Sequence, residues 1–359
     1  MFAAWLFLAF FGLALAGVPL LYALLGTTVG AIVVAGLSHP LETIFLSFIG
    51  GVEPFILLAV PLFIFAGELL AQGGVGKRIV EFARVLFGWL PGGLGVVTVI
   101  SCTMFGGVSG SAIADTAAIG SLVIPAMVAR GYSRGFAAAL LAVAGTIALL
   151  MPLSIPFLVY AFISGVSMRT LSMAGLLPAL ATAVALIVMC MWHGKKTGVD
   201  NGEDRSTPAQ IWAATKDAGP ALMMPLIIVG GIWSGQFTPS ESAAVAVFYG
   251  LAVSLFYYRD LTWRHIPQLM LNAFSTSATV MLVIGATGAM AWLITVEQVA
   301  VQMAEWIQLV ATEQWMFLIL FNVCLLLLGI FIEPLPAMLL SAPLFLPLAK
   351  HFGMDMVHI

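Results

Sequence analysis

Long runs of uncharged, mostly apolar residues alternate with short polar breaks along the whole chain. No side chain carries a formal charge in residues 1–41, 85–114, 135–168, 170–194, 265–296 and 314–332. A helix needs about 20 apolar residues to cross the ~30 Å hydrocarbon layer of a bilayer. The runs reach or approach this length without the alternation of apolar and polar residues seen in barrel strands. The pattern therefore predicts an all-α polytopic membrane protein with roughly 8 to 10 hydrophobic segments.

Composition excludes a soluble globular protein. The 359 residues are 62% hydrophobic and only 8% charged, whereas soluble domains carry roughly 25% charged residues. Cys102, Cys190 and Cys324 lie in apolar segments without the spacing of metal ligands, so we expect them to be packing residues. The N-terminus lacks the basic region of a cleaved signal peptide, and we expect the first segment to be a retained transmembrane helix.

The main hydrophilic stretch, residues 193–219, divides the chain near its middle. Its basic residues are Lys195, Lys196, Arg205 and Lys216, which predicts a cytoplasmic loop. The two sides of this loop resemble each other. A shift of 222 positions places Gly107 on Gly329, Pro125 on Pro347 and Gly131 on Gly353, and a shift of 220 places Pro19 on Pro239. Related halves are typical of secondary transporters, whose binding sites lie where the repeats meet.

Small residues crowd the segment TMFGGVSGSAIADTAAIGSLVIP, around Ser109, Gly110 and Ser111. Interior glycines weaken a continuous helix, but a hairpin that enters the membrane, turns and returns needs them. Such a turn leaves carbonyls and hydroxyls free to bind Na⁺, and a helix N-terminus free to face an anion. The alternative is a helix-packing face made of small residues.

Two prolines interrupt the next apolar segment. Pro152 and Pro156 remove helical hydrogen bonds, and the freed carbonyls from Gly145 onward, with the hydroxyls of Thr146 and Ser154, are candidate ligands for a hard cation. The alternative is an ordinary kinked helix.

Two acidic residues stand out in apolar surroundings. Asp115 follows Ser111 by four positions; a buried carboxylate in a membrane is costly and usually functional, but an acid near a helix N-terminus is also favoured by the dipole. Glu333 overlies Ser111 under the 222-residue shift, which places it at the tip of a second hairpin.

Two further motifs have structural explanations. Thr238, Pro239 and Glu241 form the pattern of a capping box at the start of a helix. The stretch GVGKRIVEFARVLFGW predicts an amphipathic helix lying along the membrane interface, with Trp89 at its end.

At these residues the chain resembles the large membrane subunit of tripartite ATP-independent periplasmic (TRAP) transporters. The resemblance spans essentially the whole chain and is carried by PFILLAVPLFIFAGELL, FGGVSGSAIADTAAIGSLVIPAM, RGFAAALLAVAGTIALLMPLSIP, FTPSESAAVAVFYG and FIEPLPAMLLSAPLFLPLAKHFGMDMVHI.

The resemblance implies an elevator-type secondary transporter of the bacterial inner membrane, with inverted repeats, reentrant hairpins and broken helices. It implies scaffold parts at 1–91, which includes the interfacial arm, and at 169–313, which includes the loop 193–219. Transport-domain parts fall at 92–168 and 314–359. The expected partners are a small four-helix membrane subunit and a periplasmic substrate-binding protein, and no cofactor is expected besides Na⁺ as coupling ion.

Carried over by position, the first hairpin tip is Ser109, Gly110 and Ser111, and the first broken helix runs over 145–156. The second tip comprises Glu333, Pro334 and Pro336. The chain departs from the family at Glu333, where an aspartate is common, and at Leu153, where a second proline is common. The second broken helix of the family would follow His358, so we expect the natural protein to continue beyond Ile359.

The resulting hypothesis is sodium-coupled uptake of a carboxylate, with Na⁺ near Ser109, Gly110, Ser111, Gly145 and Thr146. The protein would thus be a transporter subunit and not an enzyme. One alternative is a sodium–dicarboxylate symporter that needs no binding protein, and another is a scaffold subunit without a transport path. A remote alternative is an intramembrane serine protease, because residues 107–110 fit a GxSG pattern; its general base is missing, since the five histidines lie near segment ends.

Overall fold

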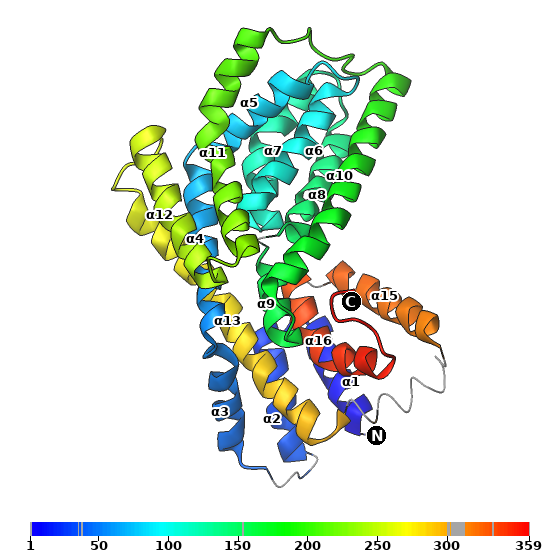
Figure 1. Cartoon of the computed structure of the whole chain (residues 1–359). Helices are drawn as coiled ribbons and strands as arrows, with labels where there is room; N and C mark the ends of the chain where they lie inside the picture. The colour runs from blue at the N-terminus through cyan, green and yellow to red at the C-terminus, as the bar shows by residue number, and fades with distance from the viewer. Residues whose placement is uncertain are drawn as a thin grey trace. The chain divides into compact units, whose positions relative to one another are not determined.

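The computed structural model describes residues 2–34, 36, 39–152, 154–299, 302, 313–331 and 334–358. Within these residues the regular structure is helical (Figure 1). The helices fall into two compact units, one comprising residues 1–57, 159–166 and 276–359 and the other residues 58–158 and 167–275. This division reflects how the helices pack in one conformation. The predicted scaffold and transport parts are defined by which helices move together, and they stay a prediction.

The larger unit holds the first hairpin region. Its helices are α4 (Ala59–Gln72), α5 (Val75–Phe87), α6 (Gly93–Ser109), α7 (Ala112–Ala129), α8 (Arg134–Leu150), α10 (Met168–Thr197), α11 (Pro208–Ser234) and α12 (Pro239–Ala252), which a π-helical turn extends over Val253–Tyr257. Helix α6 packs against α5, α7, α8 and α10. The first hairpin is therefore enclosed by helices from several parts of the chain.

The smaller unit holds α1 (Phe2–Leu15), α2 (Leu20–Val34), α3 (Leu41–Val52), α15 (Gln314–Phe331) and α16 (Pro334–His351), together with most of α9 (Ile155–Ser164) and of α13 (Ile266–Val296). A short 3₁₀ helix, Phe55–Leu58, lies at the boundary between the units. Phe317 at the start of α15 packs with Phe345 and Leu348 near the end of α16. The two helices therefore run antiparallel, as a hairpin requires.

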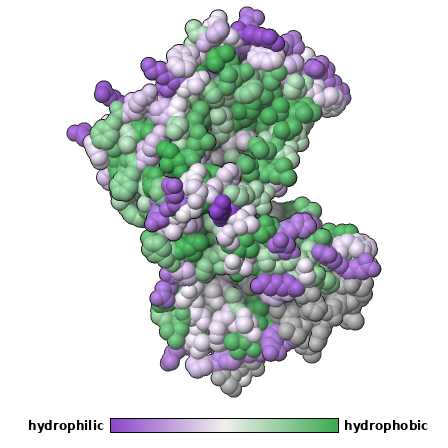
Figure 2. Space-filling model, viewed as in Figure 1, coloured by the Kyte–Doolittle hydropathy of each residue, from purple (hydrophilic) through white to green (hydrophobic). Residues whose placement is uncertain are grey.

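The membrane prediction agrees with the helices that the structure describes. Six of them are long and apolar enough to cross a bilayer, and α8 with α9 makes a seventh candidate that bends by 41° at its break. Shorter apolar helices of 10–17 residues add further candidates. Hydrophilic residues gather at the end of the larger unit where α10 and α11 are joined, and hydrophobic residues cover much of the helices below (Figure 2).

The two hairpins have matching bounds. Adding 222 to Ala112 and Ala129, the bounds of α7, gives 334 and 351, the bounds of α16. The C-termini match as well. The amide of Tyr132 donates to the Met127 carbonyl at 3.1 Å, and the amide of Met354, 222 positions on, donates to the Ala349 carbonyl at 3.0 Å. Both helices thus end in a Schellman motif, which supports the internal repeat.

The glycines of these motifs have the backbone conformation that the motif needs. Gly131 has φ +94° and Gly353 has φ +69°, in the left-handed region that side chains disfavour. Glycine therefore lies at the same position after the last turn of each hairpin.

Capping explains where two other helices begin. The predicted capping box of Thr238 and Glu241 is confirmed, with both of its hydrogen bonds present. A second box, formed by Thr207 and Gln210, starts α11. Because α10 runs on to Thr197, only residues 198–207 of the predicted hydrophilic loop 193–219 lack helical structure.

Replacing the Schellman glycines tests the equivalence of the two hairpins. Gly131→Ala and Gly353→Ala should each lower the free energy of unfolding by about 1–2 kcal/mol, because alanine disfavours the left-handed region. The measurement is the apparent melting temperature of the purified protein in detergent. Gly230→Ala is the control, since Gly230 lies inside α11 with open space around its Cα. A fall in melting temperature for Gly230→Ala as large as the fall for Gly131→Ala and Gly353→Ala would contradict the motif assignment.

Candidate functional site

The tip of the first hairpin is a tight turn between α6 and α7. Helix α6 ends at Ser109, Gly110 adopts φ +60°, and extended Ser111 begins α7. The Ser111 hydroxyl accepts a hydrogen bond from the amide of Ala114 at 3.4 Å. Glycine supplies the left-handed residue and serine the N-cap, so the predicted hairpin turn lies at the residues that the sequence indicated.

Asp115 lies one turn into α7 and is fully buried. The Ser109 hydroxyl donates a hydrogen bond to its Oδ1 and accepts one from the Ser111 amide at 3.2 Å. Because Ser111 is the N-cap, Asp115 does not cap the helix. Its carboxylate instead ties the end of α6 to the first turn of α7.

The second carboxylate oxygen of Asp115, Oδ2, is buried and has no hydrogen-bond partner within the described part of the chain. It faces a point where backbones approach closely. A Cβ atom on Gly106 would lie 2.9 Å from this oxygen, 2.7 Å from Ala148 Cα and 2.8 Å from Ala148 Cβ. The free oxygen therefore lies where both hairpin helices meet α8.

Two more glycines allow neighbouring helices to approach the backbone of the hairpin tip closely. A Cβ on Gly67 of α4 would lie 3.6 Å from the carbonyl oxygen of Ser109. A Cβ on Gly145 of α8 would lie 3.3 Å from the carbonyl oxygen of Ala112 and would clash with the Thr116 hydroxyl. Helices α4 and α8 thus enclose the tip, and Gly145 of the predicted ion site is among the residues that meet there.

At the break between α8 and α9, the groups that the prolines were predicted to free have partners within the protein. The Pro152 carbonyl accepts a hydrogen bond from the Ser172 hydroxyl at 3.0 Å. Ser154 is fully buried, and its hydroxyl accepts a bond from the amide of Phe157 at 3.3 Å. Pro156 is half-buried at the start of α9. The freed Pro152 carbonyl has its partner within the protein, and Ser154 caps α9.

Thr146 and the second-tip residues are described each within its own unit. Thr146 is exposed, and its hydroxyl donates to the carbonyl of Val143 at 2.7 Å. Pro334 is exposed at the first position of α16, and Pro336 lies in its first turn. Glu333 lies outside the described residues. The second hairpin belongs to the other compact unit.

The tip offers oxygen ligands for a hard cation. It combines one carboxylate, serine hydroxyls and the carbonyl end of α6, where the helix dipole is negative. Groups of three or more His, Cys, Asp and Glu side chains, typical of transition-metal sites, are not found among the described residues. The hydroxyl of Ser109 is bonded to a carboxylate and not to a histidine, which argues against the protease alternative.

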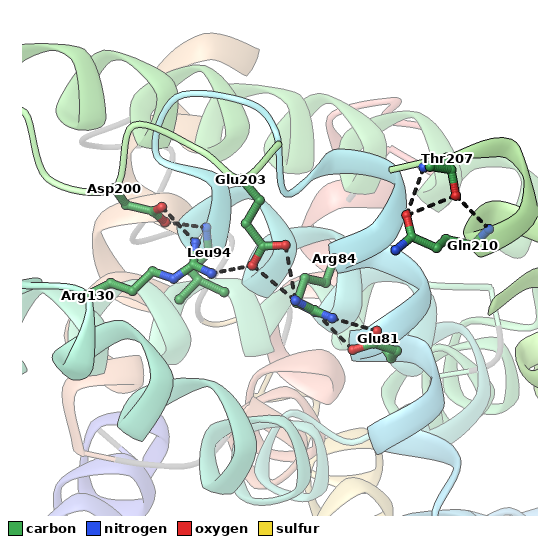
Figure 3. A network of polar contacts seen from close by, with 8 residues as sticks. All are labelled: Glu81, Arg84, Leu94, Arg130, Asp200, Glu203, Thr207 and Gln210. Atoms are coloured by element: carbon green, nitrogen blue, oxygen red, sulfur yellow. Dashed lines mark hydrogen bonds and ion pairs between the residues drawn. The ribbon is translucent and has the colours of Figure 1, made fainter. Parts of the chain in front are cut away.

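Sequence reasoning missed a second polar network at the base of the hairpin. It joins Arg84, Arg130, Asp200 and Glu203 (Figure 3). The loop between α10 and α11 supplies both acids, from positions far from their partners along the chain. The only signal in the sequence was that this loop carries charge, which is ordinary for a loop.

A pair of adjacent glycines tests the close approach of the hairpin to α8. Gly106→Ala should destabilise the protein by about 1–3 kcal/mol, as overpacking does, because its Cβ would meet the backbone of Ala148 and Oδ2 of Asp115. Gly107→Ala is the matched control, since its Cβ would meet the mobile end of Met151 at 3.2 Å. The melting temperature in detergent should fall for Gly106→Ala only. An equal fall for Gly107→Ala would contradict the close approach of Gly106 to α8.

Comparison with known proteins agrees with this architecture. The family model "Tripartite ATP-independent periplasmic transporter, DctM component" matches residues 7–359. The chain is 36% identical to the C4-dicarboxylate TRAP transporter large permease protein DctM of Rhodobacter capsulatus, over 96% of the chain and 81% of that protein.

Two further relatives have different substrates in their names. The chain is 37% identical to the isethionate TRAP transporter permease protein DctMQ of Oleidesulfovibrio alaskensis, over 95% of the chain and 54% of that protein. It is 35% identical to the 2,3-diketo-L-gulonate TRAP transporter large permease protein YiaN of Escherichia coli, over 86% of the chain and 73% of that protein. These relatives are transport subunits and not enzymes. The chain is therefore a multi-pass membrane protein that belongs to the DctM, or large permease, family of tripartite ATP-independent periplasmic transporters.

Proposed function

We propose that this chain carries the transport path for sodium-coupled uptake of a small organic anion, in the first instance a carboxylate. The observation that supports the proposal most strongly is the buried carboxylate of Asp115, with one oxygen bonded to Ser109 and the other without a partner among the residues that the structure describes. A carboxylate within the membrane is costly unless a partner offsets its charge. A coupling cation would supply that partner.

The proposed Na⁺ site lies at Ser109, Gly110, Ser111 and Gly145, with Asp115 as its charged ligand. The carbonyl end of α6 and the serine hydroxyls are hard oxygen donors, as Na⁺ prefers in broken-helix transporters. The Thr146 hydroxyl would have to leave the Val143 carbonyl to join this site. Pro152 and Ser154 would hold the break between α8 and α9 in shape rather than bind the ion, because their polar groups already have partners.

Bound Na⁺ would add positive charge beside the N-terminus of α7, where the helix dipole also favours an anion. The substrate anion would sit there, near the hairpin tips, with Glu333, Pro334 and Pro336 contributing the second tip. Each net positive charge that moves inward down the membrane potential gains about 2.3 kcal/mol per 100 mV. The relatives named for C4-dicarboxylate and isethionate transport both imply substrates with an acidic end group.

The complete transporter would comprise this chain, a small four-helix membrane subunit and a periplasmic binding protein, in the bacterial inner membrane. The family and the name DctMQ of one relative support this composition. We further propose an elevator movement, in which the hairpins and broken helices carry the loaded site across the bilayer.

The direct test is uptake into proteoliposomes that hold the large and small subunits, with and without an imposed Na⁺ gradient and the cognate binding protein. We expect uptake of the organic anion to require all of these components. Uptake that proceeds at the same rate without a Na⁺ gradient would contradict sodium coupling. Sodium-driven uptake without the binding protein would favour the simple symporter.

Two serines on α7 provide a matched pair for the site itself. Ser111→Ala should raise the sodium concentration for half-maximal uptake by up to about tenfold, since a lost ligand worth 1.4 kcal/mol changes affinity by that factor. Ser121→Ala should leave it unchanged, because Ser121 is exposed and its hydroxyl donates to the Ala118 carbonyl of its own helix. Equal sodium dependence of the two variants would exclude the hairpin tip as the ion site.

A further inference from the structure

The turn between α12 and α13 returns the chain to the side of the membrane that holds the α10–α11 loop. Two candidate spans separate the loop from this turn, α11 and then α12 with its π-helical extension, so the chain crosses twice between them. The hydroxyl of Tyr258 donates to the Asp217 carbonyl, in the first half of α11, at 2.8 Å. Loop and turn both belong to the larger unit. Because the basic loop is predicted to be cytoplasmic, the turn belongs to the same face.

The first part of the turn divides its side chains between the interior and the surface. Tyr258 and Leu261 are buried. Their amides donate to the carbonyls of Val253 at 2.8 Å and Ser254 at 3.4 Å, at the end of α12. Arg259 lies between them with φ +57°, in the left-handed region that side chains seldom adopt. The backbone thus holds Arg259 on the surface while the residues on either side pack inside.

The second part of the turn is fixed by a cap at the start of α13. Nδ1 of His265 accepts a hydrogen bond from the Thr262 amide at 3.2 Å, and the Thr262 hydroxyl lies at the same distance from this nitrogen. The His265 amide donates to the Thr262 carbonyl at 2.9 Å. Trp263 and Arg264 lie between these two residues and are exposed. His265 therefore shapes the turn, and Trp263 and Arg264 form its surface.

Aromatic side chains accompany the exposed arginines. Phe256 is 64% exposed and Trp263 is 66% exposed, and their rings meet edge to face with centroids 6.2 Å apart. Nε of Arg259 donates to the Phe256 carbonyl at 3.4 Å. We call Phe256, Arg259, Trp263 and Arg264 the turn patch. Large aromatic rings next to basic residues are typical of the boundary between hydrocarbon and headgroups.

The acids at the turn are already paired with another base. Asp260 binds Nη1 of Arg78 at 2.5 Å, and Asp217 of α11 binds Nε of the same guanidinium at 3.4 Å. Neither Arg259 nor Arg264 forms an ion pair with a residue that the structure describes. The turn patch therefore has two positive charges without a counter-charge in this part of the chain.

Each simple environment leaves half of the turn patch unsatisfied. Water hydrates the two arginines but also surrounds the rings of Phe256 and Trp263, and hydrocarbon does the reverse. A free phosphate ion would pair with the arginines alone. A phospholipid with an anionic headgroup satisfies both halves, because its phosphate lies where its acyl chains begin.

We propose that the turn patch binds an anionic phospholipid of the cytoplasmic leaflet. Arg259 and Arg264 hold the phosphate oxygens, which guanidinium groups recognise well. Phe256 and Trp263 lie against the glycerol and the first methylene groups. The cytoplasmic leaflet is the one whose negative surface attracts basic segments. The proposal needs the chain to be in a membrane but is independent of sodium coupling.

Native mass spectrometry of the transporter, released from detergent with added lipid, tests this site. The probes are dioleoylphosphatidylglycerol and dioleoylphosphatidylcholine, which have the same acyl chains but differ in net charge. The unmodified transporter should retain phosphatidylglycerol at lower lipid concentrations than phosphatidylcholine. Arg259→Gln together with Arg264→Gln should weaken retention of phosphatidylglycerol by about tenfold, because two basic contacts are lost.

A matched double variant controls for net charge. Arg134→Gln together with Lys195→Gln removes two exposed positive charges from the same face and should leave retention unchanged. Arg259→Lys together with Arg264→Lys should restore most of it, which shows that the glutamine variant is folded. Equal retention by the two glutamine variants would overturn the proposal, as would equal retention of both lipids by the unmodified transporter. Displacement of phosphatidylglycerol by excess inorganic phosphate would instead identify a site for a soluble anion and would also overturn it.

Two tryptophans test the aromatic half of the patch. Trp263→Ala keeps both arginines but should weaken retention of phosphatidylglycerol several-fold, because the lipid loses the ring beside its glycerol. Trp212→Ala is the control, since Trp212 is also exposed near the start of α11 but lies outside the turn patch. Equal retention by the two variants would contradict a role of Trp263 in lipid binding.

Discussion

The buried carboxylate of Asp115 joins the two helices of the first hairpin at the point where they pack against α8. The carboxylate takes one hydrogen bond from Ser109, and that bond needs the turn at Gly110 to bring α6 and α7 together. The second oxygen lies beside Gly106, where any larger residue would push α8 away. Tight packing and an unsatisfied oxygen therefore occur together, which suits a site that a cation completes.

The tip and the base of the hairpin are built by different means. At the tip, small residues bring backbones close and leave one carboxylate oxygen without a partner among the described residues. At the base, Asp200 and Glu203 fasten the helix ends to α5 and to the loop, and their carboxylates have abundant partners. Among the described residues, the hairpin therefore has an unpaired carboxylate oxygen at its tip and paired carboxylates at its base.

The sequence predicted features that depend on local chemistry. Glycine and serine composition placed the first hairpin turn, and Thr238 and Glu241 identified a helix start. The 222-residue shift matched two segments that the structure shows as α7 and α16, with bounds related by the same shift. The sequence could not predict contacts created by the fold. Asp200 caps a helix 106 positions away, and Gly106 meets Ala148 without any shared local pattern. The orientation of Thr146, next to Gly145 but on the exposed side of α8, likewise depends on packing.

The most direct test of a cation site at Asp115 is thermal unfolding of the purified protein in detergent as NaCl is added, with KCl at equal ionic strength as reference. A ligand at concentration L that binds only the folded state stabilises it by RT ln(1 + L/Kd), so the melting temperature rises as the ligand concentration exceeds Kd. The account predicts a rise with Na⁺ that K⁺ does not produce and that Asp115→Asn abolishes. A sodium-specific rise that persists undiminished in Asp115→Asn, or no specific rise at all, would contradict it.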